Sequence, residues 1–202
     1  MKKEEFEILK EKFIMKQIDG RKYDPKNGIL LPKDYVEKNK ENIVVLKFYV
    51  KNTKKGKYEQ IDIRDIDRIH KIRIAVCKAY EDSQKRLIRG HEKITTYLYE
   101  WENKDYSPLG YLGKCVNDIL EKGNITKETY DKWHKTTSEH FIDKLNKLIS
   151  DKISPDENQE IGKAQKVINM TFKYLYCMLD EKELLIFKHC HMPLDHYTLE
   201  FH

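Results

Sequence analysis

The chain has few residues that break helices and few that can form disulfide bonds. Its 202 residues include 8 glycines, 5 prolines and 4 cysteines, and no two cysteines form a Cys-x-x-Cys pair. A chain of this length can bury a core without disulfides or metal, and scattered thiols are typical of a reducing compartment. No apolar run approaches the length of a membrane span, and the opening Met1-Lys-Lys-Glu-Glu is too polar for a secretion signal. We therefore expect a soluble, cytoplasmic protein with no membrane association.

Charge and aromatic side chains are what the chain has in quantity. Charged residues make up 36% of the sequence and aromatic residues 11%, and the net charge is +5. The aromatic side chains supply apolar area that disordered chains lack, which predicts a folded protein with a heavily solvated surface. The moderate positive charge is compatible with a phosphate-binding surface without requiring one.

The hydrophobic pattern predicts a mainly α fold, a single helical domain over residues 1–202 with a small β-hairpin. The N-terminal subregion, residues 1–64, holds a helix from Lys3 to Lys16 and a surface loop over residues 19–34. Ile43–Val50 and Tyr58–Ile63 are rich in β-branched and aromatic residues or alternate in polarity. They predict a β-hairpin near residues 43–63.

Residues 65–202 form the expected helical core. Apolar residues recur at helical spacing over 65–89, 92–101, 108–122 and 126–150, and then in a last long helix. Ser107-Pro108 and Thr126 are typical of helix starts, and Gly90 and Gly123 of helix ends. The last helix begins either at the capping box Ser154-Pro-Asp-Glu157 or at Gly162 after a loop. Residues 184–187 are expected to form a short strand or a turn of helix.

A motif in residues 160–200 bears on function. Ile161-Gly162-x-x-x-Lys166-Val167 is followed, 29 residues after the lysine, by Asp195 in Pro193-x-Asp195. This arrangement resembles the helix-hairpin-helix DNA glycosylase/lyase superfamily, with a spacing nearer the archaeal 8-oxoguanine glycosylase branch. In that family the lysine follows a glycine-bearing hairpin and the aspartate follows a Pro-x-Asp turn. The family hairpin carries two glycines, whereas Gly162 stands alone here.

The resemblance implies a base-excision glycosylase/AP lyase that acts on DNA without cofactor or metal. Lys166 would attack the sugar C1′ of a flipped nucleotide and form a Schiff base, and Asp195 would stabilise positive charge on the sugar. Gly162 would let backbone N–H groups approach a phosphate at the helix start. Gln165 and Asn169 are candidates for contact with a base edge.

Two basic clusters are candidate contacts to DNA phosphates. Lys54, Lys55 and Lys57 crowd the expected hairpin tip, and Arg86 and Arg89 end the long helix that precedes Gly90. Lysines and arginines that neutralise phosphates give salt-dependent binding. Lysines at an edge hairpin also serve simply to keep it soluble, which is the alternative interpretation.

Other functions remain open at this point. The opposing hypothesis is a non-catalytic α-helical interaction protein, phage- or defence-associated, that binds a protein or nucleic-acid partner. A third is a histidine-dependent hydrolase that uses His134, beside Trp133, or the His189-Cys190-His191 group. The spacing of that group matches no zinc motif, so a buried cysteine between partly exposed imidazoles is favoured over a metal site. The pattern indicates neither a particular partner nor an oligomeric state.

Overall fold

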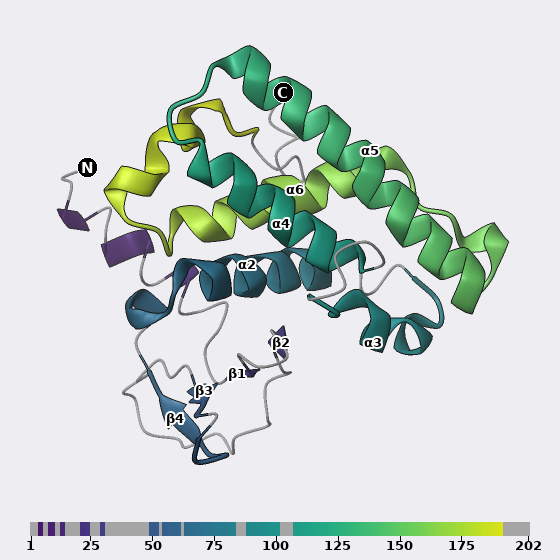
Figure 1. Cartoon of the computed structure of the whole chain (residues 1–202), viewed down its shortest axis with the longest axis horizontal. Helices are drawn as coiled ribbons and strands as arrows, with labels where there is room; N and C mark the ends of the chain where they lie inside the picture. The colour runs from purple at the N-terminus through teal and green to yellow at the C-terminus, as the bar shows by residue number, and fades with distance from the viewer. Residues whose placement is uncertain are drawn as a thin grey trace.

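The chain is mainly α-helical, as the sequence predicts (Figure 1). The structure, a computed structural model, describes residues 4–5, 8–10, 13–14, 21–24, 29–30, 49–52, 54–61, 63–83, 88–101 and 107–191. The α-helices of the described region from residue 63 onward are α2 (Arg68–Ser83), α3 (Thr95–Leu98), α4 (Pro108–Glu121), α5 (Lys127–Lys152) and α6 (Ile161–Tyr176). The 3-10 turns are η1 (Ile63–Asp65), η2 (His91–Lys93), η3 (Pro155–Glu157) and η4 (Glu181–His189).

No helix in the described part of the chain has both the length and the apolar character that crossing a membrane requires.

The N-terminal region combines a helical stretch with a small sheet. The described positions between residues 4 and 14 are all helical, which fits the predicted first helix. Four short strands follow, β1 (Lys22–Asp24), β2 (Ile29–Leu30), β3 (Tyr49–Lys51) and β4 (Tyr58–Gln60), in the order β2-β1-β3-β4. β1 pairs antiparallel with β2 and parallel with β3. The prediction of a loop over residues 19–34 is therefore wrong at β1 and β2, because β1 pairs both with β2 and with β3, a strand distant in the sequence.

The predicted hairpin is confirmed where it is described. β3 and β4 pair antiparallel, with Val50 opposite Glu59. Asn52 closes the turn, because its Oδ1 accepts hydrogen bonds from the backbone N–H groups of Lys54 and Lys55 at 3.0 and 3.1 Å. Gly56 has a φ of 66°, a conformation that favours glycine. Residues 43–48 of the predicted first strand lie outside the described residues.

Several predicted signals for helix ends are confirmed, but the helix expected over residues 65–89 is shorter, because α2 ends at Ser83 and residues 88–90 form a bend and a turn. The Ser107 hydroxyl accepts a hydrogen bond from the Gly110 N–H at 3.1 Å, and the Thr126 hydroxyl accepts one from the Thr129 N–H at 3.2 Å. Gly123 follows α4 with a φ of 65°. Ser154 caps the short η3 turn, so α6 begins after a loop, at Ile161. The predicted strand or turn over residues 184–187 lies within η4.

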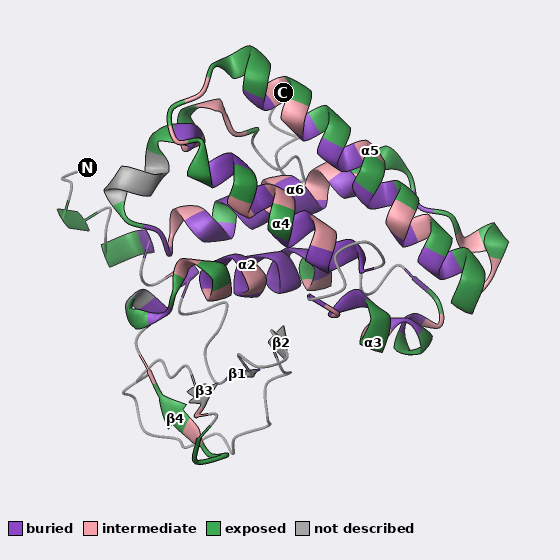
Figure 2. Ribbon diagram, in the orientation of Figure 1, coloured by how far each residue is buried: buried purple, intermediate pink, exposed green. Residues whose placement is uncertain are grey.

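Helix α2 is the centre of the fold. It packs most extensively against α6, also contacts α4 and β2, and is buried along most of its length (Figure 2). In Figure 1 it lies between the sheet and α6. Tyr174 of α6 donates a hydrogen bond to the Asp82 carboxylate at the end of α2, and the Arg21 guanidinium pairs with Glu81. The contact of Tyr174 with Asp82 helps to position α6, whose outward face carries the candidate site.

Candidate functional site

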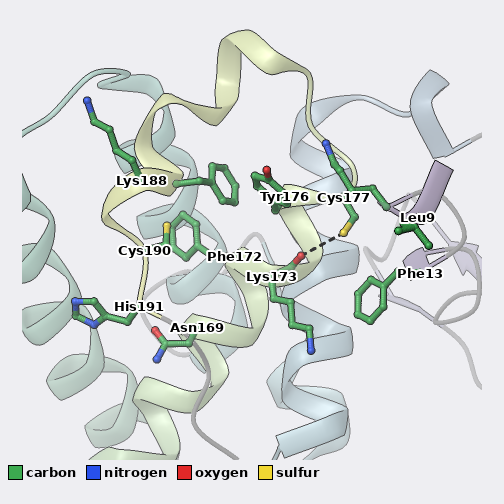
Figure 3. Close-up of a pocket in the computed structure, with 12 residues that line it drawn as sticks. Leu9, Phe13, Asn169, Phe172, Lys173, Tyr176, Cys177, Lys188, Cys190 and His191 are labelled. Carbon is green, nitrogen blue, oxygen red and sulfur yellow. Dashed lines mark hydrogen bonds between the residues drawn. The ribbon is translucent and has the colours of Figure 1, made fainter. Parts of the chain in front are cut away.

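A pocket of about 730 Å³ opens on the outward face of α6 (Figure 3). One wall comes from the N-terminal helical residues Leu9, Lys10 and Phe13, and the floor comes from α6 between Asn169 and Cys177. The remaining wall comes from the end of η4 and the residues just after it, namely Phe187, Lys188, Cys190 and His191. The volume lies in the range typical of small-molecule sites.

Aromatic rings form the body of the pocket. Phe187 lies 5.6 Å from Phe172 and 5.3 Å from Tyr176, measured between ring centroids. The Lys10 ammonium lies 4.7 Å from the Tyr176 ring centroid, and the Lys173 ammonium lies 5.2 Å from that of Phe13. No aspartate or glutamate occurs among the described residues that line the pocket. The pocket therefore presents flat apolar surfaces with positive charge beside them, which suits a planar, acceptor-rich or anionic occupant.

Two histidines meet at one end of the pocket. Nε2 of His134, on α5, lies 2.9 Å from Oδ1 of Asn169, which lines the pocket from α6. The imidazole rings of His134 and His191 lie 4.5 Å apart between centroids. His191 Nε2 in turn lies 2.9 Å from a carboxylate oxygen of Asp131 on α5. The structure thus brings together two histidines that the sequence places in separate motifs.

Burial sets the charge of this end of the pocket. His134 is 3% exposed, and burial lowers its pKa, against the raising effect of the hydrogen bond with Asn169. Burial raises the pKa of the Cys190 thiol to about 12, so this cysteine stays protonated and is not a nucleophile. Hydrogen bonds from Lys127 and then His191 lower the pKa of Asp131, which therefore stays ionised.

The cluster follows from helical spacing on α5. Tyr130, Trp133 and His134 stand at i, i+3 and i+4, so they share one side of the helix. Tyr130 is fully buried, and its ring meets those of Phe172 and His191 edge-on, at 5.8 and 5.5 Å between centroids. This aromatic packing holds the N-terminal end of α5 against α6.

Lys166, the predicted nucleophile, lies on α6 but is not among the described residues that line the pocket. Its side chain is half-buried, and it precedes Asn169 by three residues and Lys173 by seven. Residues at these spacings lie along one side of a helix. Lys166 therefore lies on the same side of α6 as the pocket, about one turn before Asn169. Asp195 lies outside the described residues, and the distance between the amine and this carboxylate stays a prediction.

The other predicted residues of α6 lie in the same turns of the helix. Gly162 is exposed, and a Cβ built on it would meet nothing within 4 Å. Gln165 is half-buried. Asn169 is the one among them that lines the pocket, but its amide oxygen already accepts from His134. The amide NH₂ of Asn169 is therefore the group that can donate a hydrogen bond to a bound molecule.

The predicted basic clusters lie apart from the pocket. Lys54, Lys55 and Lys57 are exposed at the hairpin tip, where Lys55 pairs with Glu59 at 3.0 Å. The hairpin and α6 lie on opposite sides of α2 in Figure 1. Arg89 is exposed just before Gly90, and Arg86 lies outside the described residues.

Sequence reasoning missed the pocket itself and the pairing of its histidines. His134 and His191 are 57 residues apart, and no local signal links them or marks Asp131 as a partner. In the part of the chain that the structure describes, no group of three or more His, Cys, Asp or Glu side chains is arranged to hold a metal ion.

Compared with protein-family models, curated proteins and solved structures, the chain shows no significant match.

Proposed function

We propose that the protein is a DNA-processing enzyme of the base-excision glycosylase/AP lyase type, which takes one unstacked nucleotide into the pocket on α6. The observation that supports this most is the placement of Lys166, an amine on the same side of α6 as an aromatic pocket free of carboxylates among its described lining residues. Enzymes that act on a base extrude it and hold it between apolar or aromatic side chains. Aromatic stacking binds any base, since every base has a π-face.

The proposed chemistry uses the lysine as nucleophile. The Lys166 Nζ attacks C1′ of the sugar, the glycosidic bond breaks, and the base leaves with the bonding electron pair and then takes up a proton. The sugar ring opens to a Schiff base with Lys166, from which loss of a proton at C2′ expels the 3′ phosphate and breaks the strand. Asp195 is the proposed stabiliser of positive charge on the sugar.

The lysines beside the pocket are the proposed partners of the phosphates that flank the extruded nucleotide. Lys173 and Lys188 are exposed and line the pocket from two different elements. The exposed lysines of the hairpin tip would contact the duplex farther away. Both sets predict DNA binding that weakens steeply as salt rises.

Borohydride trapping tests this function. The protein is mixed with an oligonucleotide that carries an oxidised base or an abasic site, and sodium borohydride reduces any Schiff base to a stable adduct. Lys166→Arg keeps the charge but removes the nucleophile, so we expect it to abolish the adduct. Lys163→Ala is the matched control, since Lys163 is also half-buried on α6 and its ammonium donates a hydrogen bond to Oε1 of Gln159 at 2.8 Å. An adduct that survives in Lys166→Arg, or no adduct in the wild type, rules out the proposed lyase.

Exposed apolar side chains favour a second candidate, the non-catalytic interaction protein. Ile8 is 51% exposed, Leu9 at the pocket wall is 53% exposed, and Leu185 on η4 is 52% exposed. Large apolar side chains that gather on a surface mark partner-binding sites. This candidate predicts no trapped adduct, together with a stable complex in gel filtration that Leu9→Lys disrupts.

A further inference from the structure

The side-chain amide of Asn169 is held in one orientation. An amide oxygen accepts hydrogen bonds and cannot donate them, so the 2.9 Å contact requires a proton on Nε2 of His134. His134 itself cannot turn easily. It is 3% exposed and lies among the rings of Tyr130, Trp133 and His191, at 6.0, 6.5 and 4.5 Å between centroids.

This contact fixes which side of the Asn169 amide accepts and which side donates. A free asparagine presents both an acceptor and donors, and it can therefore bond adenine at N6 and N7 together. Here Oδ1 is turned toward His134 on α5 and accepts from it, so the amide NH₂ is the group on the other side of the amide. The ammonium groups of Lys173 and Lys188, which also line the pocket, are donors only.

We propose that His134 is a positioning residue that makes the end of the pocket a donor site, so that the pocket selects a ring whose edge presents acceptors over one that presents an exocyclic amine. The choice of a nucleobase as the ring rests on the proposed function. A base with a carbonyl at the edge that meets Asn169 gains a hydrogen bond there. A base with an amine at the same place sets two donors against each other and leaves both without a partner.

Inosine and adenosine 5′-monophosphates are the matched probes, because their purine rings carry oxygen and an amino group respectively at position 6. We expect calorimetry to show inosine monophosphate binding about 5- to 150-fold more tightly, the range that one well-formed base contact gives. His134→Leu frees the Asn169 amide to rotate, so the ratio of the affinities for the two nucleotides should fall toward one. His134→Gln keeps an N–H donor and should retain part of the preference. Asn169→Asp replaces the donor by an acceptor and should reverse it.

A spectroscopic measurement tests the positioning role without any ligand. Long-range ¹H–¹⁵N NMR spectra distinguish the two neutral tautomers of histidine, and we expect His134 to carry its proton on Nε2. The opposite tautomer, equal affinity for the two nucleotides, no binding of either, or a ratio unchanged in both His134→Leu and Asn169→Asp would each overturn the inference. If any of these results is found but borohydride still traps a Lys166-dependent adduct, this inference is wrong and the proposed function is still supported.

Discussion

Replacing Gly162 with alanine separates what this glycine does for folding from what it does for DNA. Gly162 is the second residue of α6, and a Cβ there meets nothing within 4 Å. Alanine loses less backbone entropy on folding than glycine does, so the substitution should stabilise the protein by about 0.5–1 kcal/mol. In a chain of this size that corresponds to a rise in melting temperature of about 1–4 °C.

Gly113→Ala is the comparison within the same protein. Gly113 is also helical, in α4, but its Cβ would lie 2.6 Å from Cζ3 of Trp101, a side chain that is only 7% exposed. Overpacking of this kind costs about 1–3 kcal/mol, more than the gain in backbone entropy. We expect a net loss of about 1–2 kcal/mol and a melting temperature lowered by about 2–8 °C.

Thermal unfolding followed by circular dichroism measures both variants, and fluorescence anisotropy with a labelled abasic duplex measures DNA binding. If a DNA phosphate approaches the start of α6, the methyl group of Gly162→Ala obstructs it, and affinity should fall although stability rises. A lower melting temperature in Gly162→Ala would refute the reasoning about open space at this position. Unchanged affinity for the duplex would refute the phosphate contact at Gly162.

Three further predictions concern charge and burial. Burial lowers the pKa of His134, so this histidine takes up a proton at higher pH in the unfolded chain than in the folded chain. The free energy of unfolding should therefore fall as pH drops below about 6.5. The contribution of this group is at most about 1.4 kcal/mol per pH unit. Urea titrations of wild type and His134→Gln check this, and equal slopes would contradict it. Glu81→Ala removes a carboxylate that pairs with the Arg21 side chain, which is 7% exposed, and should cost about 3–5 kcal/mol. Glu59→Ala at the exposed pair with Lys55 should cost less than about 1 kcal/mol; similar losses in the two urea titrations would be inconsistent with this. Cys190, with a pKa of about 12, should react with iodoacetamide at pH 8 at least about 100-fold more slowly than free cysteine, as mass spectrometry of the labelled peptide can establish.

Local signals in the sequence predicted the helical elements well because each signal acts within a few residues. Ser107 and Thr126 cap helices through hydrogen bonds to backbone groups three residues away, and Gly123 ends α4 through its own φ angle. The β3–β4 hairpin is equally local. The pairing of β1 with β3 is not local, since it joins strands more than 20 residues apart, and no local pattern indicates it.

The chain alone determined a mainly α fold, because apolar residues at helical spacing must bury a continuous stripe wherever the helices end up. Lys166 and Asn169 share one side of α6 for the same reason. Only the tertiary structure decided that His134 from α5 meets Asn169 and His191, and that the N-terminal residues and η4 complete an aromatic pocket over α6. These groups come from elements far apart in the sequence, and the way the helices pack places them together.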